Sequence, residues 1–96
     1  PPTAIFSQSD GMAIGAMRAI EDAGLKVPED FSIIGFDDIE ASRYVKPALT
    51  TVAQNKEKIG SSASELLIKM IENDNKNIEP MILPVDLIER ESCRQI

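Results

Sequence analysis

Hydrophobic and polar residues follow one another along the chain in blocks that predict an α/β fold. Short apolar runs at residues 3–6, 32–36 and 49–52 have the length and composition of strands. Two longer segments, residues 11–23 and 56–72, carry apolar side chains at helical spacing. The first strand, the first helix and the second strand form a βαβ unit with parallel strands. The pattern therefore predicts a parallel sheet with helices packed on it.

The apolar run at residues 31–36 is followed directly by Asp37 and Asp38. It has no polar alternation, which predicts a strand buried on both faces, and Gly35 would let another backbone approach closely. Ligands of open α/β sheets bind outside the carboxyl ends of the strands, so both aspartates are candidate binding residues. A solvated turn, or an aspartate that caps the short segment 39–44, explains the same residues. The residues alone leave these readings open.

The first helix has recognisable ends. Ser9 or Asp10 is a good N-cap, Gly24 can end the helix in the left-handed conformation, and Pro28 prevents its continuation. One apolar stripe runs along it, and Ile14 falls outside that stripe. Ile14 is therefore either a single exposed apolar side chain or a contact with a partner subunit.

The second half of the chain predicts a short helical turn at 39–44, a strand, a helix capped by Asn55 and a polar turn at 73–77. Pro84 interrupts the segment 81–89, which favours an edge strand there, and the polar end 90–96 is expected to fray. The helix at 56–72 has one apolar face, which consists of Ile59, Ala63, Leu66, Leu67, Met70 and Ile71.

Composition excludes several classes of function for this stretch. Its 96 residues make one small domain or a piece of a larger one, and a net charge of −6 argues against a nucleic-acid-binding face. With one cysteine and no histidine, a disulfide framework and the usual zinc sites are excluded. Phosphate-binding and nucleophile motifs are missing, and no apolar run approaches the roughly 20 residues that span a bilayer. We therefore expect no enzyme, no metal, no cofactor and no membrane partner.

The order and spacing of several short motifs resemble the LacI/GalR family of bacterial transcription regulators. The first three are Ser9-Asp10-x-Met12-Ala13-x-Gly15-Ala16, Gly24-x-x-Val27-Pro28-Glu29-Asp30 and Ile33-Ile34-Gly35-Phe36-Asp37-Asp38. The likeness continues through Pro47-x-Leu49-Thr50-Thr51-Val52-x-Gln54, Gly60 and Leu83-Pro84-Val85-x-Leu87-Ile88-x-Arg90-Glu91-Ser92. It covers nearly the whole chain.

The resemblance implies that residues 1–96 are the C-terminal portion of the effector-binding and dimerisation domain. The implied fold is α/β: part of a parallel, three-layer, Rossmann-like lobe of the periplasmic-binding-protein type. The chain would cross between lobes near residues 50–56, and the helix at 56–72 would pack on the other lobe. The full regulator would be a cytoplasmic homodimer that binds a small, sugar-like effector and reaches operator DNA through an N-terminal helix-turn-helix outside this stretch.

The resemblance also assigns roles to particular residues. Ser9 and Asp37 match positions that line the effector cleft, with Asp10 as the helix cap beside it. Ser9 stands where the family often has Asn, which shortens its polar reach. The implied dimer contacts are Met12, Ala13, Ile14, Met17, Arg43, Tyr44, Val45 and Pro47.

A second function of a different class shares this fold. A periplasmic sugar-binding protein that feeds a transporter has the same Ser-Asp-x-x-Ala pattern. The motifs that begin at Val27 and Pro47 favour the regulator, and an interface at Ile14 favours a dimer. The residues before Pro1 distinguish the two, because a helix-turn-helix there supports the regulator and a signal peptide supports the transport protein.

Overall fold

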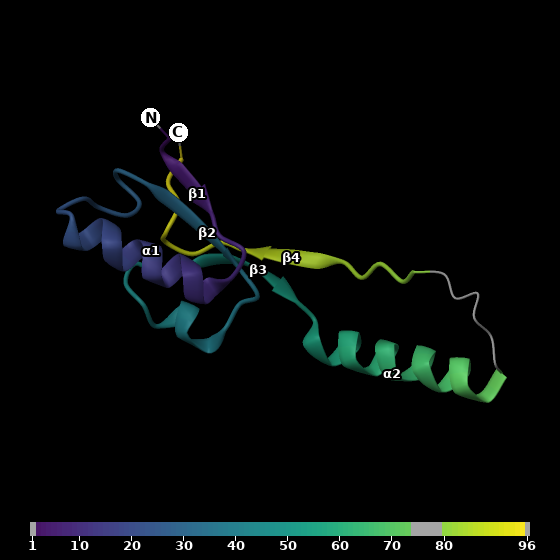
Figure 1. The fold of residues 1–96 in the computed structure, drawn as a ribbon. Helices are drawn as coiled ribbons and strands as arrows, with labels where there is room; N and C mark the ends of the chain where they lie inside the picture. The colour runs from purple at the N-terminus through teal and green to yellow at the C-terminus, as the bar shows by residue number, and fades with distance from the viewer. Residues whose placement is uncertain (1, 74–79, 96) are drawn as a thin grey trace. The chain divides into compact units, whose positions relative to one another are not determined.

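The structure is a computed structural model that describes residues 2–73 and 80–95 (Figure 1). The elements in chain order are β1 (Ala4–Phe6), α1 (Asp10–Asp22), β2 (Ser32–Phe36), the 3-10 helix η1 (Glu40–Arg43), β3 (Thr50–Gln54), α2 (Lys56–Asn73) and β4 (Val85–Ile88). They form two compact units. The larger comprises Pro1–Ala53 and Asp86–Ile96, and the smaller comprises Gln54–Val85.

The strands form one sheet with the order β1-β2-β3-β4. β1 pairs with β2 and β2 pairs with β3, both in parallel. Helix α1 connects the first parallel pair, so the predicted βαβ unit is present and the α/β fold class is confirmed. β4 lies at an edge and begins immediately after Pro84, which agrees with the expected edge strand.

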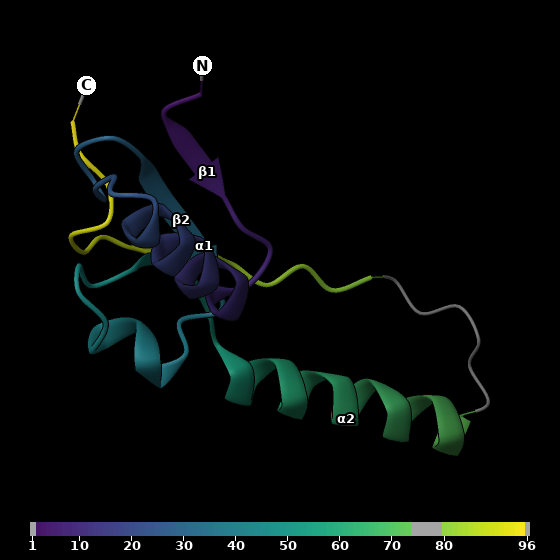
Figure 2. The ribbon, with the colours of Figure 1, turned by 60° about the vertical axis from the view of Figure 1, so that its left-hand side comes forward.

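Helix α1 covers one face of the sheet in the larger unit (Figure 2). The core includes residues of the helix itself and consists of Ala13, Met17, Val27, Ile33 and Leu49. The other face is less covered. In β2 only Ile33 and Gly35 are buried, and Phe6 in β1 is 68% exposed. The expected burial of this strand on both faces is therefore wrong for the described residues, which place a helix against one face only.

The first helix is capped by Ser9, whose Oγ accepts a hydrogen bond from Met12 N at 3.2 Å. Asp10 is instead the first helical residue and is completely buried, so its expected role as the cap is wrong. Gly24 has φ +81° just beyond the helix, as the C-terminal signal predicted. Leu25 N then bonds to Ile20 O at 3.0 Å and closes the last turn.

The polar end of the chain is bound to the sheet, so the expected fraying is wrong for residues 90–95. Ser92 is completely buried between β2 and β3. Its Oγ donates to Ile33 O at 2.6 Å and accepts from Thr50 N at 2.8 Å, and Arg94 N donates to Ser32 Oγ at 3.1 Å. A short polar tail is ordered when it supplies partners that buried backbone groups require.

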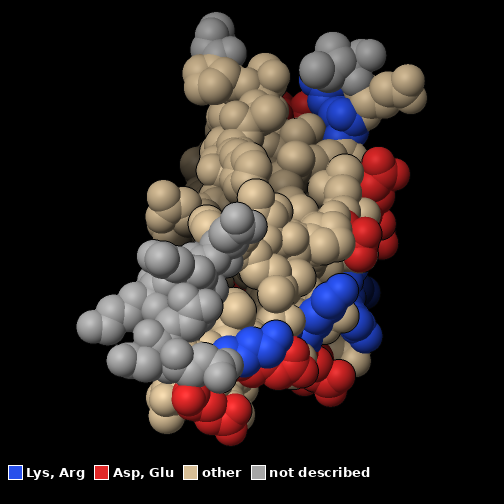
Figure 3. Space-filling view, turned by 90° about the vertical axis from the view of Figure 1, so that its right-hand side faces the viewer, with Lys and Arg blue, Asp and Glu red and all other residues tan. Residues whose placement is uncertain are grey.

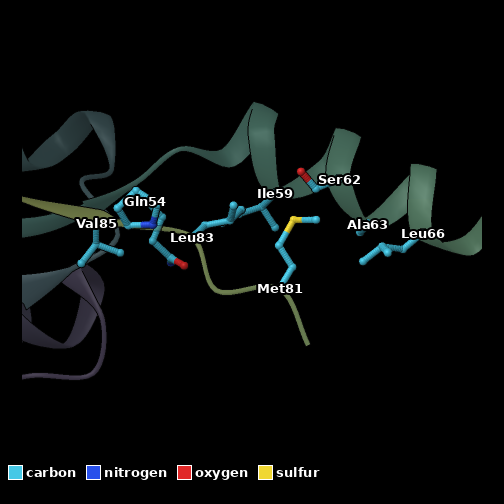
Figure 4. A pocket seen from close by; sticks show the side chains of 9 residues that line it. Gln54, Ile59, Ser62, Ala63, Leu66, Met81, Leu83 and Val85 are labelled. Carbon is cyan, nitrogen blue, oxygen red and sulfur yellow. The ribbon is translucent and has the colours of Figure 1, made fainter. Parts of the chain in front are cut away.

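The smaller unit contains α2 and the extended segment that leads back to β4. Asn55 Oδ1 accepts a hydrogen bond from Lys58 N at 3.0 Å, so the predicted cap of this helix is confirmed. A pocket of about 310 Å³ lies between the helix and the segment, and Figure 4 shows its lining side chains. Ile71 and Leu67 of the predicted apolar face stay 72% and 57% exposed. Residues 74–77 of the predicted polar turn lie outside the described residues.

Candidate functional site

Asp37 and Asp38 follow β2 at its carboxyl end, and both have positive φ. The φ of Asp38, +54°, is ordinary left-handed backbone that aspartate tolerates, whereas the φ of Asp37, +117°, is rare outside glycine. A conformation of that kind costs about 1–3 kcal/mol and persists where surrounding contacts impose it. Asp37 N donates to Val52 O at 2.8 Å, which continues the parallel pairing of β2 with β3 past the end of the strand.

The carboxylate of Asp38 is used inside the fold. Its Oδ1 lies 2.7 Å from Arg90 Nη2, and both side chains are largely buried, at 16% and 14% exposed. Arg90 also donates to Leu49 O at 2.9 Å through Nη1. Asp38 therefore attaches the loop to the C-terminal segment.

Asp10 is completely buried beneath this loop and accepts several hydrogen bonds. Its Oδ2 accepts from Ile39 N at 2.9 Å and from Ser42 Oγ at 2.6 Å. Its Oδ1 accepts from Thr51 Oγ1 at 2.6 Å. Burial by itself raises the pKa of this carboxyl, but the hydrogen bonds from Ser42, Thr51, Ile39 and the backbone of Phe36 outweigh burial and lower the pKa below its ordinary value. Asp10 is therefore a buried carboxylate that remains ionised.

Ser9 lies at the N-terminus of α1, in the loop that follows β1. β1 and β2 are parallel neighbours in which Phe6 is paired with Ile34, and Ser7 N bonds to Ile34 O at 2.9 Å. The loops that carry Ser9 and Asp37 thus both begin at the carboxyl ends of the parallel strands. They are also joined, because Asp10 next to Ser9 binds Ile39, two residues after Asp37.

The predicted interface residues are partly surface and partly core. Met12 and Tyr44 are 60% and 72% exposed, whereas Ala13 and Met17 are buried in the core. Ile14 is half-buried against that core, so it is not a single exposed side chain. It lines a hollow of about 210 Å³, whose walls are Ile14, Met17, Arg18, Glu21, Val45 and Lys46. Arg43, the last residue of η1, is exposed, and Pro47, which follows η1, is half-buried.

The distribution of charge gives no extended basic surface on the face shown in Figure 3, where acidic and basic side chains are interspersed. Among the described residues no group of three or more Cys, Asp or Glu side chains is placed to hold a metal ion. Within residues 2–73 and 80–95, neither helix has the length and apolar character to cross a bilayer.

A family model described as a periplasmic binding protein-like domain matches residues 1–93. The chain belongs to this family. Among curated relatives, the ribose operon repressor of Haemophilus influenzae is 45% identical over 91 residues, which cover 95% of this chain and 27% of the repressor. The chain thus spans little more than a quarter of the length of such relatives. Their names are those of transcriptional repressors, so the resemblance to LacI-type regulators is confirmed.

Solved structures of the family superpose closely on the chain. A LacI family transcriptional regulator from Enterococcus faecium with bound ribose is 41% identical, with a TM-score of 0.82 over 95% of this chain and 34% of that one. The lac repressor dimer bound to operator and the anti-inducer ONPF is 37% identical, with a TM-score of 0.87 over 96% of this chain and 32% of that one. Both confirm a partial lobe of the periplasmic-binding-protein type.

The contacts that organise the site were not predictable from the sequence. The buried cluster of Asp10, Ser42 and Thr51 joins residues up to 41 positions apart, and Arg90 reaches Asp38 across 52 positions. No local pattern indicates such pairs. The available signal was weak. Thr50 and Thr51 are adjacent hydroxyl-bearing residues in a strand next to β2, and because successive side chains of a strand point to opposite faces, they bind different partners.

Proposed function

We propose that this chain is the effector-sensing and dimerisation part of a LacI-type transcriptional regulator, usually a repressor. A small sugar-like effector binds at the carboxyl ends of the strands, between this lobe and a second one. Its binding alters the affinity of the regulator for operator DNA. The observation that carries the proposal is Asp37, which follows β2 in a strained conformation beside the N-terminus of α1. The carboxyl ends of the strands are where α/β folds bind ligands.

The chemistry of the two residues suits a polyhydroxylated ligand. The Asp37 carboxylate can accept hydrogen bonds from ligand hydroxyls, and each such charge-assisted bond contributes roughly 1.5–3 kcal/mol. The oxygen of Ser9 accepts from Met12 N, so its hydroxyl hydrogen can be donated to a ligand oxygen. Convergence of a few polar groups at one edge is typical of small-molecule sites.

The second lobe lies outside this chain in the proposal. The chain crosses between lobes near residues 50–56, and α2 packs on the second lobe. Two observations support this: Gln54–Val85 forms a separate compact unit, and apolar side chains of α2 such as Ile71, Leu67 and Ile68 are exposed at 72%, 57% and 52%. Apolar side chains in that number are costly to leave in water, at roughly 25 cal/mol per Å².

Operator DNA is contacted through a helix-turn-helix upstream, since the net charge of −6 makes this stretch unsuited to phosphate binding. The regulator acts in the cytoplasm as a homodimer, without a catalytic step, metal or cofactor. A periplasmic transport protein is not favoured, because the relatives reported above are named as repressors and regulators. A helix-turn-helix in the residues before Pro1 would distinguish the two.

Replacing Asp37 by Ala in the full-length protein should weaken effector binding about 10- to 100-fold, because a charge-assisted hydrogen bond is lost. Isothermal titration with ribose, which is bound in a structure of a relative, is the first measurement. Asp22→Ala is the matched control, since Asp22 is an exposed carboxylate at the far end of α1, paired only loosely with Arg18 at 3.6 Å. Equal affinities in wild type and Asp37→Ala would remove Asp37 from the site.

Replacing Ile14 by Glu should shift the full-length protein from dimer towards monomer by about 100-fold in dissociation constant, since a charge would be desolvated at an apolar contact. Analytical ultracentrifugation over a concentration series measures this. Ala19→Glu adds the same charge to an exposed position of the same helix and should leave the dimer intact. A dimer of unchanged strength in the Ile14 variant argues that the interface lies elsewhere.

A further inference from the structure

The loop that presents Asp37 is held at every residue by a contact from another element. Asp37 N is bound to Val52 O at 2.8 Å, and Asp38 N to Thr51 Oγ1 at 3.3 Å. Ile39 N is bound to Asp10 Oδ2 at 2.9 Å. Three successive backbone donors thus have fixed acceptors, two of which are side-chain oxygens. Backbone with a φ of +117° at a non-glycine residue requires such surrounding restraint.

Two of these restraints come from a single buried carboxylate. Asp10 binds Ile39 directly through Oδ2 and binds Thr51 Oγ1 through Oδ1 at 2.6 Å. Thr51 Oγ1 in turn accepts from Asp38 N. Because a hydroxyl has one hydrogen, donation to Asp10 leaves the oxygen lone pairs of Thr51 directed to the Asp38 amide. The carboxylate therefore fixes the orientation of the hydroxyl and, through it, the peptide that follows Asp37.

We propose that Asp10 and Thr51 are positioning residues of the effector site: they do not touch the ligand but hold the segment 37–39 so that the Asp37 carboxylate is presented at the sheet edge. Both side chains are completely buried, so neither can contact a ligand at the surface. The proposal rests on the proposed function for the ligand. Its conformational part concerns only contacts within this chain.

The alternative is that the cluster stabilises the fold without influencing the site. Adjacent threonines in β3 separate the two readings. Thr51 is 0% exposed and its hydroxyl binds Asp10 and the Asp38 amide, whereas Thr50 is 3% exposed and its Oγ1 accepts from Arg90 N at 2.9 Å. Replacing either threonine by Val removes one buried hydroxyl of the same size. A merely structural role predicts similar effects for both.

The test compares Thr51→Val, Thr51→Ser and Thr50→Val in the full-length protein by amide hydrogen exchange and by titration with ribose. We expect Thr51→Val to speed exchange at Asp38 and Ile39 about tenfold, while the amides within β2 stay protected. Ribose affinity should fall about tenfold, which is within the range of one lost hydrogen bond. Thr51→Ser, which keeps the hydroxyl, should restore both values, and Thr50→Val should change neither.

Several outcomes would overturn the inference. Unchanged exchange at Asp38 and Ile39 in Thr51→Val shows that the hydroxyl does not hold the loop. In a second outcome, Thr51→Val speeds exchange at Asp38 and Ile39 and still binds ribose with full affinity, while Asp37→Ala binds ribose weakly. That result shows that the hydroxyl holds the loop but that ribose binding does not depend on it. If Asp37→Ala also binds normally, the proposed site itself fails. A wild type that binds no ribose counts against ribose as the effector, and the exchange comparison then decides the positioning role.

Discussion

Replacing Gly35 by Ala should destabilise the fold by about 3 kcal/mol, because the position has no room for a methyl group. A Cβ built there would overlap Oδ1 of Asp10 and lie 2.9 Å from Cδ2 of Leu49. The far end of a long side chain could move aside cheaply, but the Asp10 carboxylate is fixed by Ile39, Ser42 and Thr51. Moving it would weaken bonds that offset the burial of a charge.

Chemical unfolding of the full-length protein measures this loss, with Gly15→Ala as the matched control. Gly15 lies within α1, is exposed, and has no atom within 4 Å of a built Cβ. There the same change should stabilise the protein by roughly 1 kcal/mol through helix propensity. Opposite signs at the two glycines are the expected result. A Gly35→Ala variant as stable as wild type would mean that Asp10 can leave its position without cost.

Local rules were sufficient to locate the elements. An apolar run identified β2 with its bounds at residues 32–36. Asn55 marked the start of α2, and the pair Ser9 and Asp10 marked the start of α1 without showing which of the two is the cap. Gly24 marked the end of α1. Each of these signals depends on residues within one turn of the position concerned, so one sequence contains all the information required.

At Gly35 the sequence indicates that space is scarce but not which atoms fill it. A glycine near the end of a buried strand indicated a close approach, and the close approach exists. The expected neighbour was another backbone, but the atoms present belong to the side chains of Asp10 and Leu49. Sequence patterns indicate that space is scarce at a position, whereas the identity of the neighbour depends on tertiary packing.

Polar residues were the least predictable part of the candidate site. Ser92 and Arg90 stand in a polar tail that local rules assign to solvent, yet Ser92 is completely buried and Arg90 pairs with Asp38 at 2.7 Å. A polar side chain is buried wherever a distant backbone group needs a partner. The resemblance to LacI-type regulators directed attention to Ser9 and Asp37, but it did not identify the buried groups that hold their loops.

Replacing Asp10 by Asn should cost roughly 2–4 kcal/mol of stability at pH 7, although the two side chains have nearly the same shape. The carboxylate accepts on both oxygens, and hydrogen bonds to a charged group contribute about 1.5–3 kcal/mol each. An amide has one oxygen, so its nitrogen would face either Thr51 or the donors from Ile39 and Ser42. The substitution also removes a negative charge from the first turn of α1, where the helix dipole favours it.

The cost of Asp10→Asn should depend on pH in one direction. The pKa of Asp10 is lowered in the folded protein, because its hydrogen bonds outweigh the opposing effect of burial, and an unfolded aspartate has a pKa of about 3.9. The charged form therefore contributes stability that is fully present above about pH 5 and is lost as the pH falls through the folded pKa.

Asn does not titrate. We expect the stability difference between wild type and Asp10→Asn, measured by urea unfolding from pH 7 down to pH 3, to be constant above about pH 5 and to shrink below pH 4. A difference that stays constant to pH 3 would show that Asp10 has the same pKa in the folded and unfolded protein, and that its hydrogen bonds do not favour the charged form.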